Sequence, residues 1–325
     1  MSGIFGIPWD LSISESHLLA LGGCILGVLL LGSLAGFVLS LRARNDRGRR
    51  LATDVRDRVA AWWGMVIVVF GAILVGEIAT LCLFGLLSFL ALREFITLTP
   101  TRRADHHTLF WAFFVIIPLQ YFLLGAGWYG MFIIFVPVWS FIFIAIRSTL
   151  TGDSTRYLER AAKIQWGLML CVYCLSHLPA LMLLDITDFG GRQAELLVWV
   201  IVVAQMSDVL QYVWGKCLGR HQVAPHLSPN KTWEGLLGGA ISASGIGMAL
   251  WWLTPYGPWY ALAMAGTVTA LGFAGGIVMS AIKRDGGVKD FGHLIPGHGG
   301  ILDRVDSLLF TAPVVFHLTR FYWTA

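Results

Sequence analysis

The chain has 325 residues, of which 57% are hydrophobic and only 13% are charged. A soluble domain usually carries about 25% charged residues, so this composition excludes an ordinary soluble globular protein. The 14 Trp, 20 Phe and 8 Tyr also exclude a disordered chain, which would contain much less apolar mass. Because the net charge is only +4, the positions of the basic residues carry more information than their sum.

Ten apolar runs follow one another along the chain, and several are long enough to cross a bilayer as a helix of about 20 residues. They occupy residues 17–41, 60–78, 79–96, 108–124, 129–146, 166–184, 196–218, 236–253, 259–282 and 307–323. The second and third runs are nearly continuous and the last is weakly apolar. We therefore expect an all-α, polytopic integral membrane protein with about nine or ten transmembrane helices.

Basic residues gather in alternate connections between these runs. The first, third, fifth, seventh and ninth connections hold 21 of the 23 Lys and Arg, and only Arg192 and Arg320 fall on the other side. Since Lys and Arg are enriched in cytoplasmic loops, we expect these connections to face the cytoplasm and both termini to lie outside it. No repeat or linker indicates a second folded unit, so we predict a single membrane domain over residues 1–325.

One cytoplasmic connection continues a polar helix face into a polar loop. The helix face and loop contain Asp208, Gln211, Tyr212, Gly215 and Gly219, then Ser228, Pro229, Lys231, Thr232, Glu234 and Gly235. An ionisable residue such as Asp208 within a span is costly and normally faces a bundle interior or a watery cavity. Two interpretations of Asp208 stay open at this point. It could be a buried polar residue that locks helix packing, or it could form part of the wall of a binding site.

A second cytoplasmic connection, over residues 280–306, combines cations, carboxylates and glycines. Its members are Lys283, Arg284, Lys289, Asp290, Gly297, Gly299, Gly300, Asp303, Arg304 and Asp306. Topology explains some of the cations, but not the carboxylates beside them. Mg²⁺ prefers oxygen ligands, usually one or two carboxylates with water and phosphate, and glycines let backbone amides approach an anion. The pattern predicts a site for phosphate and metal, with a transporter gate loop as the alternative.

The spacing in this second connection resembles the signature of the phosphatidate cytidylyltransferase family, also called CDP-diacylglycerol synthase. Every fixed position of that signature is present between Ser280 and Asp306: a Ser, Lys-Arg, Lys-Asp, a Gly-His-Gly-Gly turn and Asp-Arg-x-Asp. The upstream Ser228–Gly235 segment and the Asp208 helix are also similar to that family. The resemblance covers about the C-terminal 120 residues, so residues 196–325 are the expected catalytic portion, and residues 1–195 are membrane helices of uncertain role.

The sequence departs from that family at one position. Members typically carry Gly-Asp four residues before the signature Ser, and that Asp is a metal ligand, whereas this chain has Gly275 and Gly276 there. The second family metal ligand corresponds to Asp303, which is present. The resemblance therefore implies the family fold and points to a divergent branch.

The resemblance implies a reaction of CTP with phosphatidate that gives CDP-diacylglycerol and pyrophosphate, with Mg²⁺ as the cofactor. A phosphomonoester is largely dianionic near neutral pH because its second pKa is about 6. The reaction therefore needs charge neutralisation and alignment rather than a strong base. The lipid headgroup and the site would lie at the cytoplasmic face of a membrane, expected to be the bacterial inner membrane, while the acyl chains stay in the bilayer.

Each site residue receives an expected role from this resemblance. Asp303 would be a direct Mg²⁺ ligand, with Asp290 and Asp306 as supporting or second-metal ligands. The phosphates would be held by Lys231, Lys283, Arg284 and Lys289. His298 would anchor the loop or donate to phosphate, and Arg304 would orient the aspartates or bind phosphate. The remaining substrate contacts are expected from Asp208, Tyr212, Ser228, Thr232, Ser280, Gly299 and Gly300.

Three alternatives remain open on the sequence. The chain could be a transporter or channel, a catalytically weak relative that binds lipid or nucleotide, or an enzyme that activates a different lipid phosphate. The expected partners are CTP, phosphatidate or a related lipid phosphate, and the bilayer, with no nucleic acid. A homodimer is implied only by the family resemblance.

Overall fold

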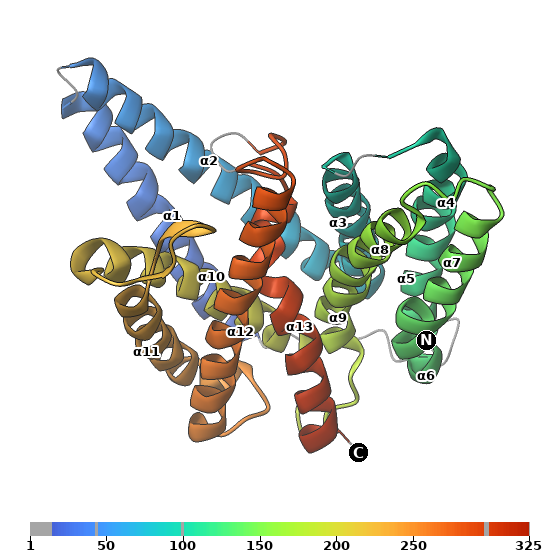
Figure 1. The fold of residues 1–325 in the computed structure, drawn as a ribbon. Helices are drawn as coiled ribbons and strands as arrows, with labels where there is room; N and C mark the ends of the chain where they lie inside the picture. The colour runs from blue at the N-terminus through green and yellow to red at the C-terminus, as the bar shows by residue number, and fades with distance from the viewer. Residues whose placement is uncertain (1–14, 43–44, 99–100, 296–298, 325) are drawn as a thin grey trace.

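The computed structural model describes residues 15–42, 45–98, 101–295 and 299–324 (Figure 1). Helices form nearly all of its regular structure, and a single two-stranded hairpin is the only sheet within these residues. The predicted all-α class is therefore confirmed.

The first three helices form the N-terminal part of the molecule. α1 (Glu15–Arg42) and α2 (Asp46–Val75) pack as an antiparallel hairpin that leans away from the other helices (Figure 1). α3 (Glu77–Thr97) follows directly after Gly76, whose φ of 127° is readily adopted only by glycine. The nearly continuous second and third apolar runs are thus two helices separated at one glycine.

Three further helices are each interrupted by a π-helical turn. They are α4 (His106–Trp111), η2 (Ala112–Ile116) and α5 (Ile117–Gly125); α6 (Tyr129–Ile134), η3 (Phe135–Ser140) and α7 (Phe141–Thr149); and α8 (Tyr157–Gly167), η4 (Leu168–Cys174) and α9 (Leu175–Ala180). Proline removes a backbone donor and clashes with the preceding turn, and each interrupted helix contains one, at Pro118, Pro137 and Pro179. Short 3-10 turns, η1 (Arg103–Asp105) and η5 (Leu181–Leu183), flank this group.

The C-terminal part positions the polar loops. α10 (Gln193–Leu218) leads into a hairpin of β1 (Gln222–Ala224) and β2 (Ser228–Thr232), followed by α11 (Trp233–Ala249) and the turn η6 (Trp251–Leu253). α12 (Pro258–Asp285) and α13 (Leu302–Trp323) close the chain, and α13 packs between α12 and α9 (Figure 1). The signature segment is therefore the connection between α12 and α13.

Eight helical stretches among the described residues are long and apolar enough to cross a membrane. They are Gly22–Arg42, Val55–Val75, Glu77–Thr97, Arg103–Gly125, Tyr129–Thr149, Tyr157–Leu183, Gln193–Leu218 and Pro258–Asp285. The two remaining apolar runs correspond to α11, which is only 17 residues long, and to α13, whose first turn is charged. The chain is an integral membrane protein, and the count of nine or ten spans stays a prediction.

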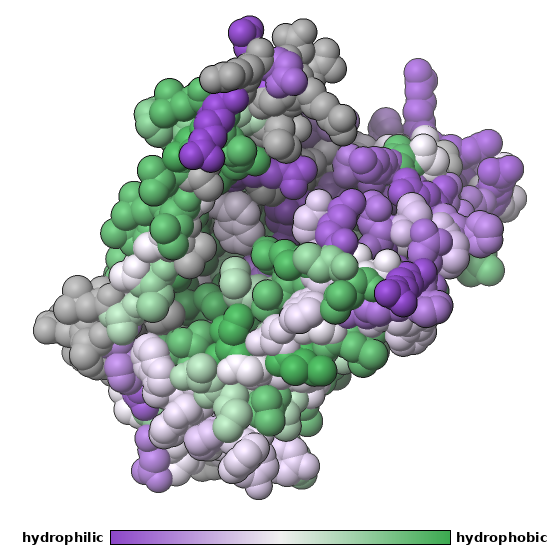
Figure 2. Space-filling view, turned by 90° about the vertical axis from the view of Figure 1, so that its left-hand side faces the viewer, coloured by the Kyte–Doolittle hydropathy of each residue, from purple (hydrophilic) through white to green (hydrophobic). Residues whose placement is uncertain are grey.

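The buried core lies around α13, which packs against α3, α9, α10 and α12, and it includes the fully buried Leu178, Leu197 and Leu309. Apolar side chains also cover much of the outer surface, as Figure 2 shows, whereas hydrophilic residues gather toward the top and right of that view. Large exposed apolar side chains such as Leu31, Val75 and Ile241 are expected where helices face lipid.

Candidate active site

The carboxylate of Asp303, in the first turn of α13, organises the signature loop. The ammonium of Lys283 donates to its Oδ1 at 2.8 Å, and the backbone amides of Phe291 and Gly300 donate to its Oδ2 at 2.8 and 3.0 Å. Asp303 is 7% exposed, so these donors compensate a buried charge that would otherwise be costly. The carboxylate thus ties α12, the loop and α13 together.

The loop is also held by a residue from the N-terminal half of the chain. Glu94 in α3 accepts hydrogen bonds from the backbone amides of Ile301 at 3.0 Å and Leu302 at 2.8 Å. These amides open α13, where free N–H groups and the helix dipole favour a negative charge. A β-carbon on Gly300 would lie within 3.0 Å of the Glu94 carboxylate, so a larger residue there would displace that carboxylate. Glu94 therefore positions the loop although it lies some 200 residues away in sequence.

One cavity of about 720 Å³ gathers half of the predicted site residues. Its lining from the predicted set is Asp208, Tyr212, Lys289, Asp290, Gly299, Asp303, Arg304 and Asp306. Gly299 has a φ of 83°, and a β-carbon there would lie 2.9 Å from Asp303 Oδ2 and 3.5 Å from Asp290 Cβ. Carboxylates and cations from α10, the loop and α13 therefore face one space, as the sequence predicts for a phosphate and metal site.

Lys231, near the end of β2, extends toward α12 on the inner side of this region. Its Nζ lies 3.5 Å from the backbone oxygen of Phe273 and 4.9 Å from the centre of that ring. A β-carbon on Gly276 would lie within 3.0 Å of the same ammonium. Burial lowers the pKa of Lys231, and the attraction of Asp306 and Asp208 opposes that effect. Lys231 thus takes the space beside α12 that a side chain at position 276 would need.

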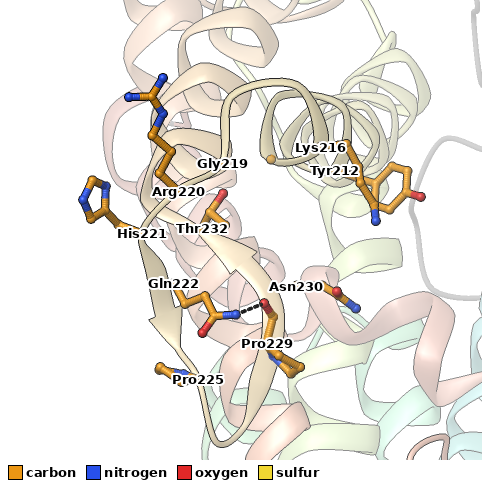
Figure 3. A pocket seen from close by; sticks show the side chains of 11 residues that line it. Tyr212, Lys216, Gly219, Arg220, His221, Gln222, Pro225, Pro229, Asn230 and Thr232 are labelled. Atoms are coloured by element: carbon orange, nitrogen blue, oxygen red, sulfur yellow. Dashed lines mark hydrogen bonds between the residues drawn. The ribbon is translucent and has the colours of Figure 1, made fainter.

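A second cavity, of about 540 Å³, lies between the hairpin and the end of α10 (Figure 3). Tyr212 and Lys216 reach it from α10, while Gln222, Pro229 and Asn230 belong to the hairpin, where the Gln222 side chain donates to the Pro229 oxygen at 2.9 Å. Tyr212 lines both cavities. The two spaces therefore share one wall on α10.

Two residues at the junction of the hairpin and α11 anchor the hairpin to that helix. Thr232 caps the helix by accepting from the Gly235 amide at 3.1 Å. Glu234 accepts from the His221 ring at 2.6 Å and from the backbone amides of Arg220 and His221. The bond from His221, aided by those amides, lowers the pKa of Glu234 to about 2. The predicted substrate contact at Thr232 is thus a helix cap that also lines the second cavity.

Three predicted residues make local contacts outside the lining of the large cavity. Arg284 donates to the backbone oxygens of Leu227 and Val288, and so braces the hairpin and the loop. The Ser280 hydroxyl donates to the Gly276 oxygen at 2.7 Å within α12, and Ser228 begins β2 opposite Ala224. His298 lies outside the described residues.

Six residues of the large cavity escaped prediction from sequence, and four of them are polar or aromatic. Arg58 and Trp62 of α2, Gln205 of α10 and His293 of the loop line it together with the signature aspartates. Arg58 stands in a run of arginines that topology alone explains, and Trp62 stands in an apolar run, so neither position carries a distinguishing local signal. Only the folded arrangement of α2 beside the loop identifies them.

The cavity's donor set is chemically suited to Mg²⁺. Its lining includes four carboxylates, those of Asp208, Asp290, Asp303 and Asp306. Within the described residues, no three His, Cys, Asp or Glu side chains form a ready-made metal cluster. Mg²⁺ needs only one or two carboxylates when phosphate and water supply the other ligands. The residues therefore fit a metal that binds together with a phosphate substrate.

Comparison with known proteins places this arrangement in a family. The model of the cytidylyltransferase family matches residues 56–322, which include most of α2, Glu94 and the whole signature loop. The chain belongs to the cytidylyltransferase family. It is accordingly a nucleotidyltransferase, and the family likeness extends well beyond the C-terminal residues that carry the signature.

Individual relatives agree with this membership. The uncharacterized protein YnbB of Escherichia coli (strain K12) is 39% identical over 299 residues, which cover 91% of this chain and 96% of that protein. Phosphatidate cytidylyltransferases of Staphylococcus aureus (strain COL) and Staphylococcus haemolyticus (strain JCSC1435) are each 36% identical over 121 residues. Those matches cover 37% of this chain and 46% of each enzyme, so they span less than half of either enzyme's length.

Proposed function

We propose that this cytidylyltransferase transfers the CMP group of CTP to the phosphate of phosphatidate, forming CDP-diacylglycerol and releasing pyrophosphate. The observation that best supports this proposal is the cavity in which Lys289 and Arg304 lie beside Asp290, Asp303 and Asp306. Two polyanionic substrates can meet only where their charges are neutralised, and this cavity supplies cations together with carboxylates for a metal.

The chemistry needs no strong base from the protein. An oxygen of the lipid phosphate forms a bond to the α-phosphorus of CTP, while the bond from that phosphorus to the leaving pyrophosphate breaks. Lys289 and Arg304 would hold the phosphates in line. Lys283 has three donors, one of which is used on Asp303, so it can bind phosphate while it keeps the loop in place. Asp290, Asp303 and Asp306 would hold Mg²⁺, which neutralises phosphate charge when bound.

The proposal includes a location at the cytoplasmic face of a bacterial inner membrane. The signature loop and the arginine-rich start of α2 both belong to connections rich in Lys and Arg, which normally remain in the cytoplasm. CTP would enter the cavity from that side, while the acyl chains of the lipid stay beside the apolar helices. A homodimer, implied by the family resemblance, is a separate prediction.

A second candidate function is supported by the contact between Lys231 and Gly276. Without an aspartate at position 276, and with the Lys231 ammonium beside it, the chain would have one metal ligand fewer than its family pattern. Such a protein could bind nucleotide and lipid with little turnover, or could accept a different lipid phosphate.

Incubation of the purified protein with labelled CTP, Mg²⁺ and a panel of lipid phosphates tests these alternatives. We expect label to enter the lipid fraction with phosphatidate and to do so less well with a polyprenyl phosphate. Lys289→Ala should lower kcat/KM about 10- to 150-fold, because a charge-assisted contact contributes about 1.5–3 kcal/mol. The control Arg49→Ala removes an exposed cation from α2 and should have little effect. No labelled lipid with any acceptor would contradict the proposed transfer.

A further inference from the structure

Part of the wall of the large cavity comes from α2, a helix that carries none of the signature residues. Arg58 and Trp62 line the same space as Lys289 and Asp303. They lie four residues apart within one continuous helix, so their side chains stand one turn apart on the same face.

The contacts of α1 with α2 show which face of α2 meets the cavity. The indole Nε1 of Trp63 donates to the Ser33 hydroxyl of α1 at 3.2 Å. Val59, one turn earlier, packs where a β-carbon on Gly32 of α1 would lie, 3.3 Å away. Positions 59 and 63 thus face α1, and positions 58 and 62 are turned toward the cavity.

The chemistry of these two side chains suits a nucleotide better than an acyl chain. The cavity is lined by charged and polar side chains, including Lys289, Asp290 and His293, so a hydrocarbon chain would gain little there. An aromatic base instead offers a π-face to an indole and polar edges to the surrounding groups. The cavity's other aromatic ring, Tyr212, is approached by the Lys216 ammonium at 5.8 Å. Guanidinium groups bind phosphate oxygens in a fork geometry.

Building on the proposed function, we propose that α2 forms the nucleotide subsite of the cavity, in which Trp62 stacks on the pyrimidine base and Arg58 binds the phosphates. The signature loop then acts on the reacting phosphates, and the N-terminal helices recognise the substrate. This proposal gives α2 a role in nucleotide recognition, although its sequence indicates only a membrane-spanning helix.

Equilibrium binding of CTP and of inorganic tripolyphosphate, measured without lipid, separates base contacts from phosphate contacts. Base–aromatic stacking contributes about 1–3 kcal/mol, so Trp62→Leu should weaken CTP binding about 5- to 150-fold and leave tripolyphosphate binding unchanged. Trp62→Phe, which keeps an aromatic ring, should retain most of the affinity. Trp63→Leu is the matched control, since it removes the neighbouring indole that faces α1. It should leave the affinities for CTP and for tripolyphosphate unchanged.

A parallel pair of variants tests the arginine. Arg58→Gln should weaken CTP and tripolyphosphate equally, by about 10-fold or more for one charge-assisted contact. Arg56→Gln removes an exposed arginine outside both cavities and should leave both affinities unchanged. Arg58→Lys should recover part of the affinity because the positive charge remains.

Three outcomes would overturn this inference while leaving the proposed function intact. CTP binding by Trp62→Leu at the wild-type level would show that the ring does not contact the base. If Trp62→Leu weakened the binding of CTP and of tripolyphosphate equally, the ring would only support the shape of the cavity. If it changed only the KM for lipid, the ring would contact the lipid and not the base. A wild-type protein that does not bind CTP would instead remove the proposed function itself.

Discussion

Asp303 combines two tasks at the residue scale, because its carboxylate both faces the cavity and holds the loop. Asp303→Asn keeps the shape but replaces one acceptor oxygen by an NH₂ group, which cannot accept from Lys283 or from the two amides. Each donor left unsatisfied costs about 1–3 kcal/mol. We expect a loss of at least about 100-fold in kcat/KM and faster hydrogen exchange in the loop. Asp285→Asn, at the exposed end of α12, is the control, and full activity of Asp303→Asn would refute the role.

Glu94 gives a second residue-scale prediction, because it caps α13 from a distant helix. Glu94→Ala removes the acceptor for the amides of Ile301 and Leu302, each bond contributing about 1.5–3 kcal/mol. We expect reduced kcat/KM and faster proteolysis of the α12–α13 loop in a protein that still folds. Glu159→Ala, which removes an exposed carboxylate paired with Lys163 on α8, should leave both measurements unchanged. Equal rates of proteolysis of the α12–α13 loop in Glu94→Ala and Glu159→Ala would rule out the capping role.

The close approach of α12 and α13 determines the site geometry at the scale of elements. A β-carbon on Gly275 would lie 2.9 Å from the backbone oxygen of Asp306, whereas one on Gly266 would meet only Ser244 Oγ at 3.6 Å. Gly275→Ala should therefore push α13 away and cost about 1–3 kcal/mol, seen as a lower thermal midpoint in detergent together with lost activity. Gly266→Ala, on the same helix, should be close to wild type. Equal midpoints for the two variants would mean that the helices can separate freely.

Hydropathy predicts the elements far better than it predicts their irregularities. The apolar runs correspond to helices because burial in lipid or core requires apolar side chains and internally bonded backbone. The β-hairpin and the π-turns were not predicted, because a short polar hairpin and a proline-induced turn leave no hydropathy signal. Among site residues, Lys289 and Asp290 belong to one local sequence motif, and both line the cavity. Glu94, Arg58 and Trp62 were missed because their partners lie far away in sequence.

The two ends of α13 lie on opposite sides of the whole molecule. At its C-terminal end, the amide of Thr187 bonds to the Trp323 oxygen at 3.2 Å, so the α9–α10 connection lies far from the signature loop. Single cysteines at Thr155 and Gly286, in a cysteine-free background, should be labelled only from the cytoplasm. Those at Thr187 and Gly257, both exposed, should be labelled only from outside. Labelling of Gly286 from outside would reverse the topology and separate the site from CTP.

We propose that residues of the large cavity catalyse nucleotidyl transfer from CTP to a lipid phosphate. The most direct test compares CTP labelled at the α-phosphate with CTP labelled at the γ-phosphate, each incubated with purified protein, Mg²⁺ and phosphatidate. We predict that α-label enters the lipid fraction while γ-label leaves as pyrophosphate in equal molar amount, and that Asp303→Asn abolishes both. Release of α-label as free CMP, or retention of both labels in intact CTP, would contradict the proposal.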